Sequence, residues 1–175
     1  TGIEHFIDLT GLSCSYNQIT SLNISQNISL TGLFCYDNQL TSLNLNGAIA
    51  LAGLYAWNNQ LVNLDVSQNT SLISLSCNNN QLISLDLSQI SCALQINESD
   101  FSENPNLNCI EVTDLSCWQN NFIGFLDTTY QYYSTNCSGT ISIKEHTINK
   151  KIHKVTDLLG RETKQTNQLL FYIYD

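Results

Sequence analysis

The first 143 residues of this 175-residue chain contain no lysine and no arginine, although they carry eleven acidic residues. All six basic residues lie at or beyond Lys144, together with the remaining four acids, and the formal net charge of the chain is −9. A region without basic side chains cannot release counterions from phosphates, which argues against nucleic-acid binding. The same absence disfavours attraction to anionic membrane surfaces.

Several other features are scarce. The chain has no methionine and one proline, and only 12% of its residues are charged, about half of the usual ~25%. No apolar run approaches the ~18 residues of a transmembrane helix, and no signal-peptide pattern is present. We therefore expect a mature segment or an internal fragment without membrane insertion. Leucine, amides and hydroxyls dominate instead, with 25 Leu, 22 Asn, 19 Ser, 15 Thr and 12 Gln.

Motifs of catalysis and metal binding are also missing. The histidines His5, His146 and His153 stand in no recognisable catalytic spacing, and the chain has no phosphate loop, G-x-S-x-G or H-E-x-x-H. Residues 97–104 are rich in oxygen ligands, as calcium sites are, but they lack the order and the central glycine of an EF-hand. We interpret this segment as a solvated polar loop. The prediction is a non-enzyme with no cofactor and no metal.

A 21-residue repeat dominates the first half of the chain. The unit reads L-x-x-L-x-C-x-x-N-Q-L-x-x-L-x-L-x-x-N-x-x and occurs four times without an insertion. After Leu87 the period breaks, residues 88–106 look irregular, and the pattern returns once at 107–112. The most regular columns are Leu12, Leu33, Leu54 and Leu75, and Asn17, Asn38, Asn59 and Asn80.

These columns have a direct physical interpretation. One 21-residue coil cannot bury its own leucines, so stacked neighbours must cover them. Residues 12–15 alternate between apolar and polar side chains, which is typical of a strand with one buried face. The asparagine column is expected at a tight bend, where an amide side chain satisfies backbone groups that the turn leaves unpaired.

The unit resembles the leucine-rich repeat in its short nested form, over about residues 2–112. The resemblance implies a mainly β solenoid with a parallel sheet along one side, here assigned to residues 1–106. Residues 104–110, Trp118 and residues 133–137 resemble the closing segment of secreted bacterial proteins with this repeat. That likeness implies a C-terminal cap over 107–137. The opening residues 1–6 resemble a first coil of the same proteins, which implies further chain upstream.

The seven cysteines fall into two groups. Cys14, Cys35 and Cys77 occupy an inward column of the repeat, and we interpret them as small buried apolar groups without disulfides. Four others cluster near the closing segment, and four cysteines allow three connectivities. The resemblance implies a Cys109–Cys137 disulfide that staples the cap, which would leave Cys92 and Cys117 as a weaker candidate pair. Disulfides there indicate an oxidising compartment.

The composition changes again from about residue 138. The motif V-x-D-x-x-G-R at 155–161, followed by the aromatic run 170–174, resembles the C-terminal sorting domain of type IX secretion cargo. The resemblance implies recognition by the outer-membrane export machinery, and an extracellular or outer-surface location reached through the periplasm. Because such domains usually continue beyond this point, we expect the domain (138–175) to be truncated. The alternative is a plain β-hairpin that pads the solenoid. The residues matched to the sorting signal are Asp157, Gly160, Arg161, Phe171 and Tyr172.

The repeat also predicts which side chains point outward from the main sheet. Four aromatic residues share one face in adjacent coils, and three polar residues border them; together these are Phe34, Tyr36, Tyr55 and Trp57, with Asp37, Asn58 and Asn78. If about half of each ring is exposed, the patch covers ~300–500 Å², the size of the largest patch on a typical monomer. We predict a non-catalytic recognition module that binds an extracellular protein here. Two alternatives stay open: carbohydrate binding by the aromatic rings, or structural stacking without a ligand.

Overall fold

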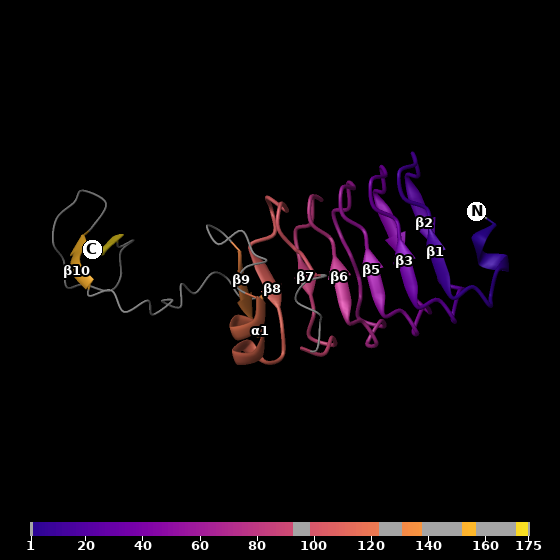
Figure 1. Ribbon diagram of the computed structural model, residues 1–175. Helices are drawn as coiled ribbons and strands as arrows, with labels where there is room; N and C mark the ends of the chain where they lie inside the picture. Colours follow the sequence, from indigo (N-terminus) through magenta and orange to yellow (C-terminus); the bar gives the residue numbers. More distant parts are fainter. Residues whose placement is uncertain (1, 93–98, 123–130, 138–151, 157–170, 175) are drawn as a thin grey trace. The chain divides into compact units, whose positions relative to one another are not determined.

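The computed structural model describes residues 2–92, 99–122, 131–137, 152–156 and 171–174. The chain divides into two compact units, Thr1–Ser138 and Gly139–Asp175. The first unit is a solenoid whose coils follow one another from the N-terminus onward (Figure 1). The second unit contains an antiparallel pair, β10 (Ile152–Thr156) and β11 (Phe171–Tyr174).

A four-stranded parallel sheet forms one side of the solenoid. Its strands are β1 (Gly11–Ser13), β3 (Gly32–Phe34), β5 (Gly53–Tyr55) and β6 (Ser74–Ser76), in that spatial order. Each strand pairs with the next at an offset of one repeat, so that the column from Leu12 to Leu75 is in register. The predicted fold class, a mainly β solenoid with a parallel sheet, is confirmed.

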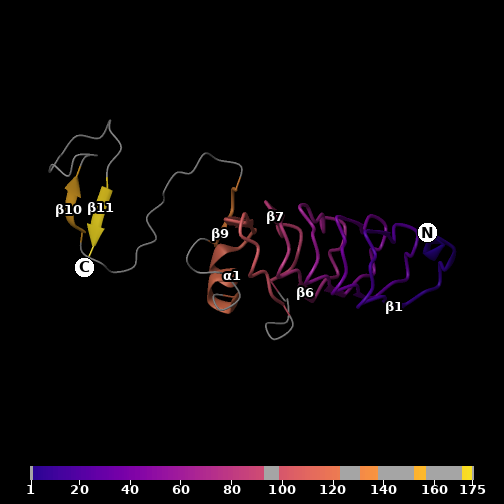
Figure 2. The same ribbon diagram turned by 90° about the horizontal axis from the view of Figure 1, so that it is seen from above.

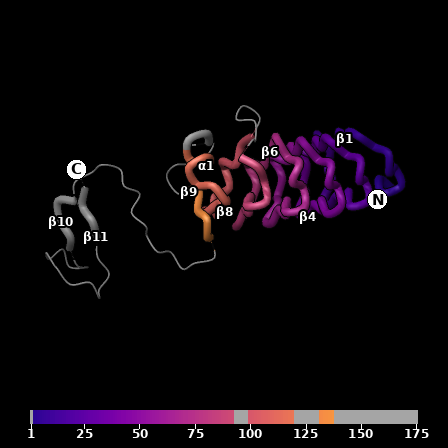
Figure 3. Tube along the Cα trace, turned by 90° about the horizontal axis from the view of Figure 1, so that it is seen from below, coloured from indigo at the N-terminus to yellow at the C-terminus, as the bar shows by residue number. Residues whose placement is uncertain are grey.

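The other half of each coil also carries short strands. β2 (Ser21–Asn23) pairs with β4 (Ser42–Asn44). Farther along the solenoid, β7 (Leu85–Asp86), β8 (Cys109–Glu111) and β9 (Tyr132–Ser134) form a parallel three-stranded sheet. Figures 2 and 3 show the successive coils from opposite sides, as flattened loops along one axis.

The leucine columns fill the space inside the coils. Leu33, Leu54 and Leu75 are fully buried, whereas Leu12 in the first complete coil is only half-buried. The 3-10 helix Ile3–His5 lies on the N-terminal side of this coil, where it takes the place of the second half of a preceding coil. The Asn27 side-chain amide ties this segment down by donating to the carbonyls of Ile3 and Phe6. Burial by neighbours on both sides is therefore what completes the core of a coil.

The asparagine column is a ladder of hydrogen bonds between asparagine side chains and backbone groups. The Asn59 side-chain oxygen accepts from the Leu40 backbone amide of the preceding coil, and its amide donates to the carbonyls of Cys35 and Ala56. The residue before each ladder asparagine has a left-handed backbone, with φ between 51° and 57°, a conformation that asparagine and aspartate tolerate well. The predicted role of these amides at a tight bend is confirmed.

A fifth coil corrects the prediction that residues 88–106 are irregular and that 97–104 is a solvated loop. Phe101 and Asn104 are fully buried, and Asp100 forms a parallel bridge with Ser76. Asn104 continues the ladder: its side-chain oxygen accepts from Leu82, and its amide donates to the Cys77 carbonyl. From residue 80 to 104 the spacing is 24 instead of 21, which hid the period. Residues 97 and 98 lie outside the described residues.

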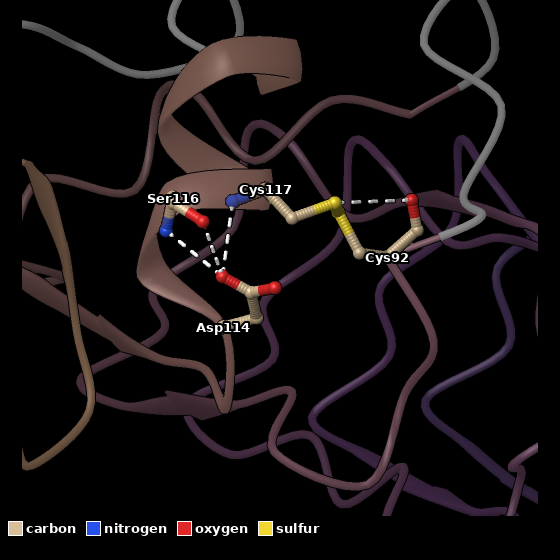
Figure 4. Close-up of a disulfide and its surroundings, with 4 residues drawn as sticks. All are labelled: Cys92, Asp114, Ser116 and Cys117. Atoms are coloured by element: carbon tan, nitrogen blue, oxygen red, sulfur yellow. Dashed lines mark hydrogen bonds between the residues drawn. A yellow bond between two sulfur atoms is a disulfide. The ribbon is translucent and has the colours of Figure 1, made fainter.

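Two disulfides lie toward the C-terminal end of the first unit. One joins Cys109 to Cys137, the pair that the resemblance implied. The other joins Cys92 to Cys117, the weaker candidate pair. Cys117 lies in helix α1 (Leu115–Phe122). Directly before the helix, Asp114 accepts hydrogen bonds from the Ser116 hydroxyl and from two backbone amides, those of Ser116 and Cys117 (Figure 4), which lower the pKa of its carboxyl group. The helix is thus capped next to the disulfide.

The sorting-signal residues of the tail are only partly within the described structure. Phe171 and Tyr172 belong to strand β11. Asp157, Gly160 and Arg161 lie outside the described residues. The antiparallel pair agrees with both sequence-based interpretations of this segment, so a sorting role stays a prediction.

Candidate ligand-binding face

The seven residues that the sequence selected lie on the outward side of the main sheet, and we call this surface the aromatic face. Pairing in register places Phe34 of the second coil beside Tyr55 of the third coil, and Tyr55 beside Ser76 of the fourth coil. The backbone amides of Asp37 and Asn58 donate to the carbonyls of Trp57 and Asn78, which keeps the following positions aligned as well. The structure therefore brings together all of the predicted ligand-binding residues.

The aromatic rings form two stacks that run from coil to coil. The ring centroids of Phe34 and Tyr55 are 4.7 Å apart with planes inclined by 2°, and those of Tyr36 and Trp57 are 4.2 Å apart at 7°. These separations are close to the ~4.8 Å spacing of neighbouring strands. Tyr16 packs edge-on against Tyr36 with centroids 5.3 Å apart. Within each pair, each ring covers one face of the other ring. The edges of both rings remain available for contact with a ligand.

Glycine makes room for one of these stacks. Gly32 and Gly53 lie two residues before Phe34 and Tyr55, on the same face of their strands. A Cβ atom would lie 3.6 Å from the Phe34 ring at Gly32, and 3.2 Å from the Tyr55 ring at Gly53. The missing side chains allow the two rings to lie over the strands that carry them.

A polar ladder borders the aromatic rings. The Asn58 side-chain amide donates to the Asp37 carboxylate over 2.8 Å, and that of Asn79 donates to the Asn58 side-chain oxygen over 2.6 Å. All three residues have the left-handed backbone that precedes each ladder asparagine. Their side chains are therefore held in a fixed row beside the rings.

The side chains of the aromatic face are partly buried and partly exposed. Phe34 is 39% exposed, while Tyr36, Tyr55 and Trp57 are half-buried. Asn78 is half-buried, and Ser76 is buried although it lies on this side of the sheet. The stacking that the structural alternative required is present, but it leaves ring edges and polar groups accessible. Ligand binding by these residues stays a prediction.

The sequence missed the part of the face that the fifth coil provides. Asp100, Ser102 and Glu103 occupy the positions that Ser76, Asn78 and Asn79 hold in the fourth coil, because Asp100 bridges Ser76 and the Asn79 amide donates to the Ser102 carbonyl. Residues 100–104 (Asp-Phe-Ser-Glu-Asn) have the same order of outward and inward side chains as the repeat unit. Alignment on the ladder asparagine, without a fixed period, would have found it.

The chemical groups of the face are set by its outward side chains and by the thiols beneath it. The buried thiols beneath it, Cys35 and Cys77, are free, and burial raises the pKa of both, so they stay protonated and unreactive. Among the residues that the structure describes, no group of three His, Cys, Asp or Glu side chains is arranged to hold a metal ion. What the face offers is aromatic edges, amides and carboxylates.

Comparison with known proteins supports the fold. The solved structure of the functional domain of InlJ from Listeria monocytogenes, which includes a cysteine ladder, is similar with a TM-score of 0.55 and 25% sequence identity. The similarity covers 77% of this chain and 32% of that chain, so this chain spans about a third of the length of the InlJ chain. No family model matches the sequence, and no curated protein matches it. The fold is that of a leucine-rich-repeat solenoid, similar to an internalin.

Proposed function

We propose that this protein is a non-catalytic recognition module that binds an extracellular protein through the aromatic face. The observation that carries the proposal is the concentration of four aromatic side chains in two adjacent coils, beside a fixed polar row. Partly exposed tyrosine and tryptophan surrounded by polar groups are typical of the residues that dominate protein interfaces. The InlJ likeness supports a surface protein of the recognition or structural kind.

An extracellular or surface location fits this role. Two disulfides indicate an oxidising compartment, and the InlJ similarity points the same way. No helix in the described parts of the chain has the length and hydrophobicity needed to cross a membrane. We further propose that the tail belongs to a type IX sorting domain, read by the export machinery, on the basis of the motif at 155–161 and the β11 aromatic residues.

A protein ligand fits the ring geometry better than a carbohydrate does. A sugar ring stacks on the flat face of an aromatic ring, and here the rings of each pair cover one face of each other. The exposed edges and the polar row instead suit the side chains and backbone of a polypeptide. Carbohydrate binding is the second candidate, because an outer ring face at the end of a stack still offers a place for one sugar.

The proposal predicts a loss of binding when the stack is removed. Immobilised wild-type protein would be screened by surface plasmon resonance against extracellular proteins and against soluble glycans. We expect protein ligands to bind, and Tyr36→Ala with Trp57→Ala to weaken the binding at least about tenfold, as truncation of interface hot spots does. Tyr132→Ala, an exposed aromatic outside the aromatic face, is the matched control. Binding that ignores the double variant, or binding of glycans alone, would contradict a protein site on this face.

A further inference from the structure

Beyond the stack of Tyr36 and Trp57, the fifth coil of the solenoid carries acidic side chains. In the column that contains both rings, the fourth coil carries Asn78 and the fifth coil carries Ser102, as the backbone hydrogen bonds across the coils show. Asp100 and Glu103 flank Ser102 in the fifth coil. We call Asn78, Ser102, Asp100 and Glu103 the acidic step.

The spacing of the coils sets the distance from Trp57 to the acidic step. Trp57 and Ser102 are two coils apart, which is about 10 Å at the usual strand spacing. Asn78, between them, has a short side chain and is half-buried. A cation interacts with an aromatic ring when it lies within about 6 Å of the ring centroid. A cation stacked on the outer face of Trp57 would therefore also come close to the carboxylates of the fifth coil.

The sequence around the step is acidic. Residues 1–143 contain eleven acidic residues and no lysine or arginine. The Asp100 carboxylate accepts one hydrogen bond, from the Ser102 backbone amide, which fixes its position and leaves lone pairs for a further donor. The aromatic face also carries Asp37. A ligand that matches this surface is positively charged.

We propose that the acidic step takes an arginine side chain of a cationic polypeptide ligand. The guanidinium stacks on the outer face of Trp57 and donates to the Asp100 carboxylate. Arginine suits the geometry better than lysine, because its planar guanidinium stacks on an aromatic ring and keeps its donors in the plane for the carboxylate. This inference rests on the proposed function and specifies the chemistry of its ligand.

The chain offers a matched control for this proposal. Asp65 and Asp86 lie on the other half of their coils, and each accepts a hydrogen bond from the amide two residues later, as Asp100 does. Asp100→Asn and Asp65→Asn therefore remove the same charge from the same local motif, and asparagine keeps the acceptor oxygen in both. Only the first variant changes the acidic step.

The test titrates the full chain with three probes, tetra-arginine amide, tetra-lysine amide and tetraglycine amide, by isothermal calorimetry at physiological salt. We expect tetra-arginine to bind about three- to tenfold more tightly than tetra-lysine, and tetraglycine not to bind. Asp100→Asn and Trp57→Leu should each weaken tetra-arginine binding about three- to tenfold, whereas Asp65→Asn should leave it within about twofold.

Three outcomes would overturn the inference: equal binding of the arginine and lysine probes, equal effects of Asp100→Asn and Asp65→Asn, or no binding of either cationic probe. The same variants would be tested with any protein ligand found in the screen. If that ligand needs Tyr36 and Trp57 but ignores Asp100, the arginine site is wrong and the aromatic face remains a protein-binding site. If no ligand depends on Tyr36 and Trp57, the proposed function itself fails.

Discussion

Replacing Asn80 by alanine is expected to lower the free energy of unfolding by more than about 3 kcal/mol. The Asn80 side chain is buried, its oxygen accepts from the Leu61 amide, and its amide donates to the carbonyls of Ala56 and Cys77. Alanine would leave these buried backbone groups without a partner, and each unsatisfied group costs about 1–3 kcal/mol. Urea denaturation followed by circular dichroism measures the change.

Asn17 provides the control for this prediction. It occupies the same column in the first complete coil, but it is exposed, and its amide donates only to the nearby carbonyls of Cys14 and Ser15. Water can replace these bonds, so Asn17→Ala should cost no more than about 1 kcal/mol. Equal losses at Asn17 and Asn80 would mean that the ladder does not act by satisfying buried groups across the coils.

Leu54→Ala is expected to cost about 2–5 kcal/mol, whereas Trp57→Ala should cost about 1 kcal/mol. Leu54 is fully buried at the centre of the leucine column, and its truncation leaves a cavity that the neighbouring coils cannot close. Trp57 is half-buried and loses one stacking partner, Tyr36, a contact typically worth about 0.5–1.5 kcal/mol. Both values come from the same urea titrations.

The inward and outward positions of the repeat can be tested by this comparison. Leu12→Ala, at the half-buried end of the same column, should cost less than Leu54→Ala because only one coil covers it. If Trp57→Ala destabilised the solenoid as much as Leu54→Ala, the tryptophan would be a core residue. The aromatic face would then be part of the packing instead of a surface for a ligand.

Much of the fold could be predicted because every coil of a solenoid repeats the same local structure. Four units with an unbroken 21-residue period fix which residues pair, and the pairing of Leu12 with Leu33 and of Leu33 with Leu54 follows directly. The asparagine column predicted the ladder for the same reason, since each amide meets the same backbone groups in each coil. The outward position of the aromatic residues is a consequence of the same register.

The fifth coil and the ring geometry could not be predicted in the same way. The three extra residues before Asn104 break the period, although the backbone only needs the ladder asparagine and a buried residue such as Phe101 to close another coil. Sequence shows that Tyr36 and Trp57 are neighbours across coils, but whether their faces are covered depends on side-chain torsions. The acidic step became visible only once the fifth coil was placed.

Acrylamide quenching of tryptophan fluorescence tests most directly whether the aromatic face is a binding surface. The chain has two tryptophans, and Trp118 is fully buried beside Tyr133, so quenchable emission reports on Trp57. We expect a red-shifted, quenchable component that a protein ligand protects and that disappears in Trp57→Phe. A blue-shifted emission that acrylamide does not quench and no ligand changes would show that Trp57 is packed, and would contradict recognition through this face.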